Sequence, residues 1–167
     1  MAKAMMTNMV RGKRTYALPK VGDLFAISFL TGRRVFGRVV VADAPRELAP
    51  MPGANLLYIY ADTADLPPDQ LALTVDSLLI PPVWTNRKGW TLGYYAPIGH
   101  RALSAVDVLP VHRFRDHQGK YRDERGNDLG RGIEPCGEWG LVSYRWIDDR
   151  LSDALGIPRA PDTGGEN

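Results

Sequence analysis

Residues 21–43 constrain the fold more than any other stretch, because they carry the pattern of a long β-hairpin. Apolar side chains alternate along both halves, and a short glycine-containing turn separates the halves. The alternation predicts an inward face made by Phe25, Ile27, Phe29, Val35, Val39 and Val41. It places Arg34, Phe36 and Arg38 on the opposite, outward face. Gly37 lies within the second strand, where it either leaves space opposite a Phe or marks a bulge.

The remaining chain has the pattern of short strands joined by turns, with one C-terminal helix. We predict strands at residues 56–60, 77–84, 90–96, 106–111 and 139–144, and an exposed, charged hairpin within residues 112–131 that turns at Gln118-Gly119. We predict a short helix or turn within residues 67–73, a turn at residues 86–89, and a helix at residues 147–155 that ends at Gly156. These elements predict an all-β fold, either a curved antiparallel sheet or a partly open barrel, with one short C-terminal helix.

The distribution of charge along the chain predicts its domain organisation. Basic residues precede the first acid, Asp23, so residues 1–19 are expected to form a basic flexible tail. Residues 20–157 are expected to form a single all-β domain, and residues 158–167 a disordered tail. The only cysteine, Cys136, excludes an intramolecular disulfide. This fits a reducing compartment, and no stretch resembles a secretory signal or a transmembrane span, so we expect a cytoplasmic protein.

The strongest candidates for chemistry are histidines and carboxylates of the charged hairpin. His112 and Asp116 are four residues apart and share a face of a strand, which makes them the best acid–base pair, with His100 as a second candidate. Their alternative role is that of exposed residues in salt bridges. No metal-binding spacing is present, so no metal site and no cofactor are predicted, although a divalent metal is possible if the protein is a hydrolase.

Two groups of residues are candidates for binding. The outward Arg34, Phe36 and Arg38 combine positive charge with an aromatic ring, which is the general composition of a single-strand nucleic-acid surface. The net charge of only +2 argues against nucleic acid as the partner. A second group comes from neighbouring predicted strands, and its members either fill the core or line a cleft for a ligand: Trp84, Trp90 and Tyr94.

The order of motifs along the first two thirds of the chain resembles a bacterial family, immunity protein family 26. The motifs are residues 22–27, 32–33, 36–39, 57–60, 78–82 and 89–90. This family is grouped with a small phosphotriesterase that hydrolyses the organophosphate coroxon. The resemblance covers about residues 20–100 and its motifs are structural rather than catalytic.

The resemblance implies two alternative functions. The first is an immunity-type binding protein that neutralises a cognate protein toxin by forming a complex with it. The second is a small phosphotriesterase acting on organophosphate triesters, for which His112, Asp116 and His100 are the candidate catalytic residues. A single-stranded nucleic-acid-binding module is the third and weakest alternative, and no membrane partner is expected.

Overall fold

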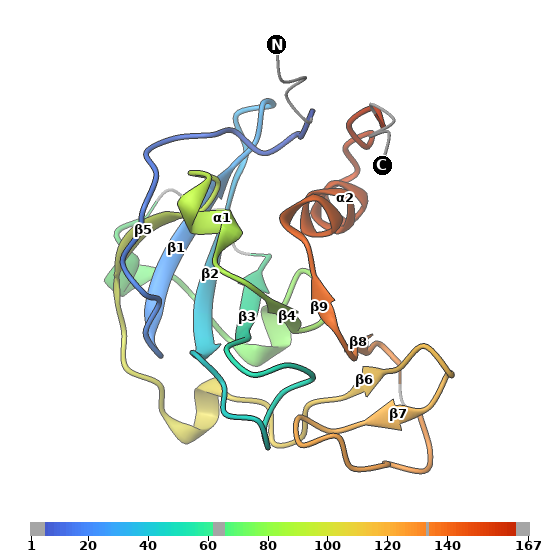
Figure 1. Ribbon diagram of the computed structural model, residues 1–167. Helices are drawn as coiled ribbons and strands as arrows, with labels where there is room; N and C mark the ends of the chain where they lie inside the picture. The colour runs from blue at the N-terminus through green and yellow to red at the C-terminus, as the bar shows by residue number, and fades with distance from the viewer. Residues whose placement is uncertain (1–5, 62–65, 133, 163–167) are drawn as a thin grey trace.

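The computed structural model describes residues 6–61, 66–132 and 134–162. Its main element is a six-stranded sheet in the order β5-β1-β2-β3-β4-β9 (Figure 1). The strands are β1 (Asp23–Ser28), β2 (Arg34–Val41), β3 (Asn55–Tyr60), β4 (Val83–Thr85), β5 (Ala96–His100) and β9 (Leu141–Val142). Neighbouring strands are antiparallel except β4 and β9, which are parallel.

A smaller sheet and two helices complete the fold. The smaller sheet has the order β7-β6-β8, with β6 (Phe114–Arg115), β7 (Tyr121–Arg122) and β8 (Gly137–Glu138). The α-helices are α1 (Lys88–Thr91) and α2 (Tyr144–Leu155), and the 3-10 helices are η1 (Pro68–Gln70), η2 (Val75–Ser77) and η3 (Ala105–Asp107). The predicted fold class, mainly β with a C-terminal helix, is confirmed. Within the described ranges the two sheets are open and form no closed barrel.

The predicted hairpin is present as β1 and β2. The strands pair antiparallel, with Phe25 opposite Gly37 in the register. Gly32, in the turn, has a φ of 86°, a conformation that glycine adopts without strain. A Cβ atom at Gly37 would overlap the Phe25 ring, so the glycine leaves space for a Phe, as the sequence suggested.

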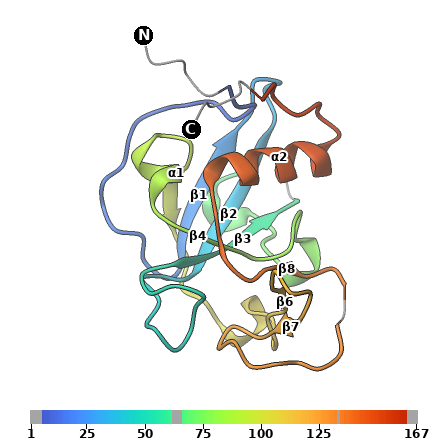
Figure 2. The ribbon, with the colours of Figure 1, turned by 45° about the vertical axis from the view of Figure 1, so that its right-hand side comes forward.

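Both faces of the large sheet are buried. One face packs against α1, α2 and the N-terminal segment, and Figure 2 shows α2 lying across the strands. The main apolar residues of this first cluster are Met9, Phe25, Ile27, Val35, Val39, Leu57, Ile59, Trp90, Tyr95, Ile147 and Leu151. The other face packs against two connecting segments, one between β3 and β4 and one between β5 and β6. The main residues of this second cluster are Leu24, Phe36, Leu56, Tyr58, Tyr60, Leu71, Trp84 and Phe114.

This second layer overturns the prediction of an outward face on β2. Phe36 is buried in the second cluster, and Arg38 is 0% exposed. The Arg38 guanidinium donates hydrogen bonds to the carbonyl oxygens of Arg101 and Ala102, and Nη1 lies 3.5 Å from the Asp107 carboxylate. Arg38 therefore ties the segment after β5 to the centre of the sheet.

The prediction for residues 86–96 is wrong. Instead of a turn and a strand, the chain forms α1 and then enters β5 only at Ala96. A strand would have sent alternate side chains to opposite faces, whereas the helical turn directs Trp90, Tyr94 and Tyr95 into one cluster. Gly93, at a φ of 89°, reverses the chain between the helix and the strand.

Other local predictions are confirmed or shifted. The C-terminal helix is confirmed, and it begins earlier than predicted because the Ser143 hydroxyl accepts a hydrogen bond from the Trp146 amide. It ends at Gly156, whose φ is 69°. The short helix within residues 67–73 is present as η1. The strand predicted at residues 106–111 is wrong, because a capping box at Ser104 starts η3 there.

The N-terminal segment is attached to α2. The buried Asp148 carboxylate accepts hydrogen bonds from the backbone amides of Asn8 and Met9, at 3.1 and 2.7 Å. Met9 itself forms a bridge with Phe29 and is buried. The division into two tails and one domain stays a prediction, and its outermost parts, residues 1–5 and 163–167, lie outside the described residues.

Candidate protein-binding site

A bulge made by Ile80, Pro81 and Pro82 interrupts the predicted strand at residues 77–84. Before the bulge the Leu79 amide donates to the Ile59 carbonyl, and after it Val83 pairs with Leu57 in the sheet. The two prolines have no N–H to donate to β3, so the chain leaves the sheet between these points. We call residues 80–82 the proline bulge.

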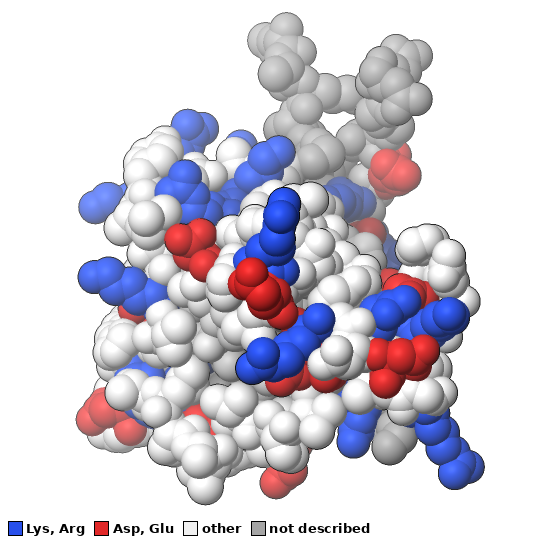
Figure 3. Space-filling view, turned by 60° about the horizontal axis from the view of Figure 1, so that its bottom comes forward, with Lys and Arg blue, Asp and Glu red and all other residues white. Residues whose placement is uncertain are grey.

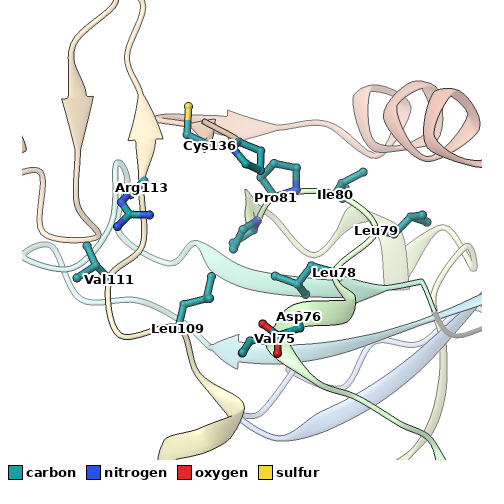
Figure 4. A pocket seen from close by; sticks show the side chains of 12 residues that line it. Val75, Asp76, Leu78, Leu79, Ile80, Pro81, Leu109, Val111, Arg113 and Cys136 are labelled. Carbon is teal, nitrogen blue, oxygen red and sulfur yellow. The ribbon is translucent and has the colours of Figure 1, made fainter. Parts of the chain in front are cut away.

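A pocket of about 410 Å³ lies on one side of the proline bulge (Figure 4). In Figure 4 the Leu109 side chain rises toward the centre of the pocket, Leu78 lies on the side opposite Arg113, and Pro81 lies near Cys136. The pocket is lined by Val75, Asp76, Leu78, Leu79, Ile80, Pro81, Pro82, Leu109, Val111, Arg113, Pro135 and Cys136. Its walls are therefore mainly apolar, with one acidic and one basic side chain.

Two further pockets continue from the first. The second, about 470 Å³, shares Ile80, Pro81 and Cys136 with the first and extends to the α2 residues Trp146 and Arg150. The third, about 490 Å³, shares its Glu138 and Trp146 walls with the second and follows the chain from β8 to β9. We call the three together the groove; its walls come from residues 75–82, 109–117, 135–143 and 146–154.

The charged side chains of the groove fall into two groups. Arg115 pairs with Glu134 at 3.6 Å and Asp153 with Arg159 at 2.5 Å, so these charges are balanced from within the chain. Four other charged side chains of the groove form no ion pair within the part of the chain that the structure describes: Asp76, Arg113, Glu138 and Arg150. Of these, Arg113 is half-buried beside apolar walls. A half-buried, unpaired guanidinium next to an apolar pocket suits an acidic group of a partner.

Cys136 is not activated as a nucleophile. Burial and the neighbouring Glu134 carboxylate raise the pKa of the Cys136 thiol to about 11, so the thiol is protonated at neutral pH. Because only the thiolate is strongly nucleophilic, Cys136 contributes to the groove as a lining residue.

His112 is buried and hydrogen-bonded to the sheet. Its Nε2 lies 2.5 Å from the Tyr58 hydroxyl, which also accepts a hydrogen bond from the Leu109 amide. Burial raises the pKa of Tyr58 to about 12, so the hydroxyl is protonated at neutral pH. Glu124 lies 3.6 Å from Nδ1, which is too long for a hydrogen bond. Burial therefore outweighs the carboxylate and lowers the pKa of His112.

This lowered pKa predicts a dependence of stability on pH. The unfolded chain binds a proton at His112 near pH 6.5, whereas the folded protein binds it only at a lower pH. The contribution of neutral His112 to the free energy of unfolding is therefore fully present above about pH 6.5. It is lost as the pH falls toward the pKa of His112 in the folded protein. We expect His112→Gln to flatten this slope in urea unfolding measured from pH 8 to pH 5. His117→Gln, at an exposed position of the same hairpin, should keep the wild-type slope; a slope unchanged by His112→Gln would contradict the assignment.

The structure does not bring the candidate catalytic residues together. Asp116 pairs with Arg122 at 2.8 Å and accepts hydrogen bonds from the backbone amides of Gln118 and Lys120. The Arg122 contact and the amide hydrogen bonds lower the pKa of its carboxyl. His112 and Asp116 therefore contact other partners, Tyr58 and Arg122, and their catalytic role stays a prediction.

His100 lies on a different strand from this pair. It contacts Asp23 at 3.0 Å on the exposed edge strand β5. Among the described residues no three His, Cys, Asp or Glu side chains group as metal ligands do.

The predicted binding residues are mainly core residues. Trp84 is buried in the second cluster, whereas Trp90 and Tyr94 are buried in the first, on the other side of the sheet. The three therefore line no common cleft. Phe36 and Arg38 are buried as well, so neither is exposed on the first hairpin for contact with a nucleic acid. Figure 3 shows one face of the molecule on which positive and negative side chains are intermixed.

The groove itself was missed by the sequence analysis, although one signal was available. Two consecutive prolines after an apolar run indicate that a strand leaves its sheet, and a chain that leaves a sheet creates a recess beside it. The opposite walls of the groove could not be predicted from the local sequence, because α2 and the small sheet that form them follow tens of residues later in the chain.

Together, the two open sheets and the apolar groove are the main features of the described surface. The family model described as Immunity protein 26 matches residues 20–124, and the chain belongs to this family. Comparison with curated proteins and with solved structures gives no match. The phosphotriesterase part of the resemblance has no support from these comparisons. Among the described residues no helix is both long and apolar enough to span a membrane.

Proposed function

We propose that this chain is an immunity protein that neutralises a partner toxin by forming a complex with it, and that the groove is the surface that binds the toxin. Membership of the Immunity protein 26 family supports a toxin as the partner. The observation that carries the choice of surface is the apolar pocket beside the proline bulge, where Arg113 forms no ion pair with any residue that the structure describes. We also propose that residues 20–157 form the binding domain and that it acts in the cytoplasm, where free Cys136 stays reduced.

The first pocket suits a large apolar side chain of the toxin. Its volume of about 410 Å³ is within the range of ligand sites in proteins, and its walls are mainly Leu, Ile, Val and Pro. Interfaces gain most of their affinity from a few anchors that fill such pockets and lose contact with water. An acidic side chain of the toxin next to that anchor would pair with Arg113, which then gives the orientation of the complex.

The walls of the groove are held in place before any partner arrives. Prolines have a fixed φ, so the proline bulge loses little freedom on binding. Trp146 packs below the Arg150 guanidinium, which lies 4.9 Å from the centre of its ring. A surface that is already ordered binds without the entropic cost of ordering its side chains, which favours a tight complex.

Arg113→Glu is expected to weaken binding of the proposed partner toxin. Reversal of the charge places a carboxylate where the partner's acidic group is proposed, so we expect Kd to rise at least 30-fold, about 2 kcal/mol. Val111→Asp, at an exposed apolar wall, should have a similar effect. The measurement is isothermal titration calorimetry with purified toxin, together with survival of cells that express the toxin.

Matched controls are available outside the groove. Arg46→Glu makes the same charge change on an exposed loop, and Val106→Asp makes the same apolar-to-acid change at an exposed site. Both should bind toxin as the wild type does. If all four variants bind equally, the groove is not the surface; if the wild type neither binds nor protects, the proposed function itself is wrong.

A further inference from the structure

The N-terminal segment carries a concentration of positive charge that the groove does not use. We call residues 11–20 the basic arm: it has no helix or strand, and four of its side chains are exposed bases, Arg11, Lys13, Arg14 and Lys20. No acidic residue precedes Asp23 in the sequence. This segment therefore carries a local excess of positive charge, although the net charge of the whole protein is only +2.

Backbone hydrogen bonds hold the basic arm beside α1. The Gly12 amide donates to the Gly93 carbonyl at 2.7 Å, and the Thr15 amide donates to the Trp90 carbonyl at 3.0 Å. These contacts place the arm beside Arg87 and Lys88, two exposed bases at the start of α1. Arg87 lines a hollow of about 330 Å³ together with the arm residues Leu18 and Pro19 and the acidic residue Asp43.

The bases of this surface lack acidic partners. No ion pair is formed by the side chains of Lys13, Arg14, Lys20, Arg87 or Lys88 among the residues that the structure describes. The hairpin at residues 112–131 differs, since its Arg122 and Arg115 pair with carboxylates. Like charges held together without counter-charges repel each other, and an anionic partner relieves that repulsion.

An aromatic side chain lies within the same run of charges. Tyr16 is 66% exposed, between Arg14 and Lys20 in the sequence, and Leu18 is 63% exposed. An exposed ring flanked by bases on an extended chain offers both parts of a single-strand site, charge for the phosphates and a flat face on which a base can stack. An acidic protein surface would use the charges but has no need of the exposed ring.

We propose that the basic arm, together with the start of α1, binds single-stranded nucleic acid. Lys13, Arg14, Lys20 and Arg87 contact phosphates, and Tyr16 stacks on a base. The residues are separate from the groove, so this binding is independent of toxin neutralisation.

The salt dependence of binding tests the proposal. Four phosphate contacts on a single strand give a slope of about +2.8 when log Kd is plotted against the logarithm of the salt concentration, which corresponds to about 50-fold weaker binding at 200 mM than at 50 mM salt. The probe is a fluorescent single-stranded RNA of mixed sequence, measured by anisotropy with the full chain. Replacing Lys13, Arg14, Lys20 and Arg87 by Ala should abolish binding, and Tyr16→Ala should weaken it by about 5- to 100-fold.

A control variant with the same net charge distinguishes the effect of this local surface on RNA binding from the effect of the overall charge. Its four alanines replace exposed bases elsewhere: Arg46, Lys120, Arg125 and Arg131. It should bind RNA as the wild type does; equal loss in both quadruple variants would overturn the proposal. Tighter binding of polyglutamate than of RNA would also overturn the proposal, because it would indicate an acidic protein as the partner. The absence of RNA binding at 50 mM salt would overturn it as well. Toxin binding by the arm variant should be unchanged, which keeps this test distinct from that of the groove.

Discussion

Replacement of Arg38 by alanine is expected to lower the free energy of unfolding by about 3 kcal/mol. Arg38 is 0% exposed, and its guanidinium is the hydrogen-bond donor for the carbonyls of Arg101 and Ala102. Without it, these carbonyls lose their donor, Asp107 loses its counter-charge, and a cavity remains on the sheet. Asp107 is 23% exposed and is partly solvated. We therefore expect a loss of stability at the lower end of the range that is typical when one partner of a buried ion pair is removed.

Urea unfolding of the purified variant measures this effect. Arg46→Ala, at an exposed loop position, should change stability by less than about 0.5 kcal/mol. Hydrogen exchange adds a local readout, because loss of the Arg38 contacts should expose the amides of residues 101–107 before the rest of the sheet. A loss no larger than that of the control would show that Arg38 does not tie this segment to the sheet.

Gly37→Val is expected to destabilise the protein by about 3 kcal/mol or to prevent folding. The new side chain would enter the space that the Phe25 ring occupies. The ring cannot move aside, because it is buried against Trp90 and Tyr95, with ring centres at 5.4 and 5.1 Å. The strain must therefore be taken up by the backbone of β2 or by the first core cluster.

A double-mutant cycle with Phe25→Ala identifies the cause. Phe25→Ala alone should cost about 3–5 kcal/mol through the cavity that it leaves. Combined with Gly37→Val, it should cost less than the sum of the two, with a coupling of at least 1 kcal/mol, because the valine fills that cavity. Gly140→Val, where a Cβ meets open space, is the matched control. Strict additivity of the two changes would contradict the steric explanation.

The elements that the sequence predicted well are those whose pattern is local. The hairpin at residues 21–43 and the helix that ends at Gly156 each carry their own periodicity and their own turn or cap. The prediction failed at residues 86–96, where three aromatic side chains must enter one cluster. A local pattern of alternating apolar residues cannot reveal that requirement, because the cluster is completed by β1, β3 and α2.

The candidate site was harder to predict than the fold, because its residues come together only by folding. His112 was nominated for its spacing from Asp116, yet its partner is Tyr58, which is 54 residues away. Alternation placed Arg38 correctly on the face opposite Val35 and Val39, but it could not show that a second layer covers that face. The groove combines the proline bulge with α2 and the small sheet, which follow much later in the chain.

Because the chain covers both faces of its own sheet, no strand of the central hairpin offers a broad surface to a partner. In the proposed complex, the toxin therefore contacts the connecting segments, α2 and the small sheet, while the strands of the large sheet hold these parts in place. These two parts can change independently: the groove segments can be exchanged for others without altering the register of β1 to β3. A single frame of this kind can thus be adapted to toxins of very different shape, and a chimaera with transplanted groove segments should acquire the specificity of the donor.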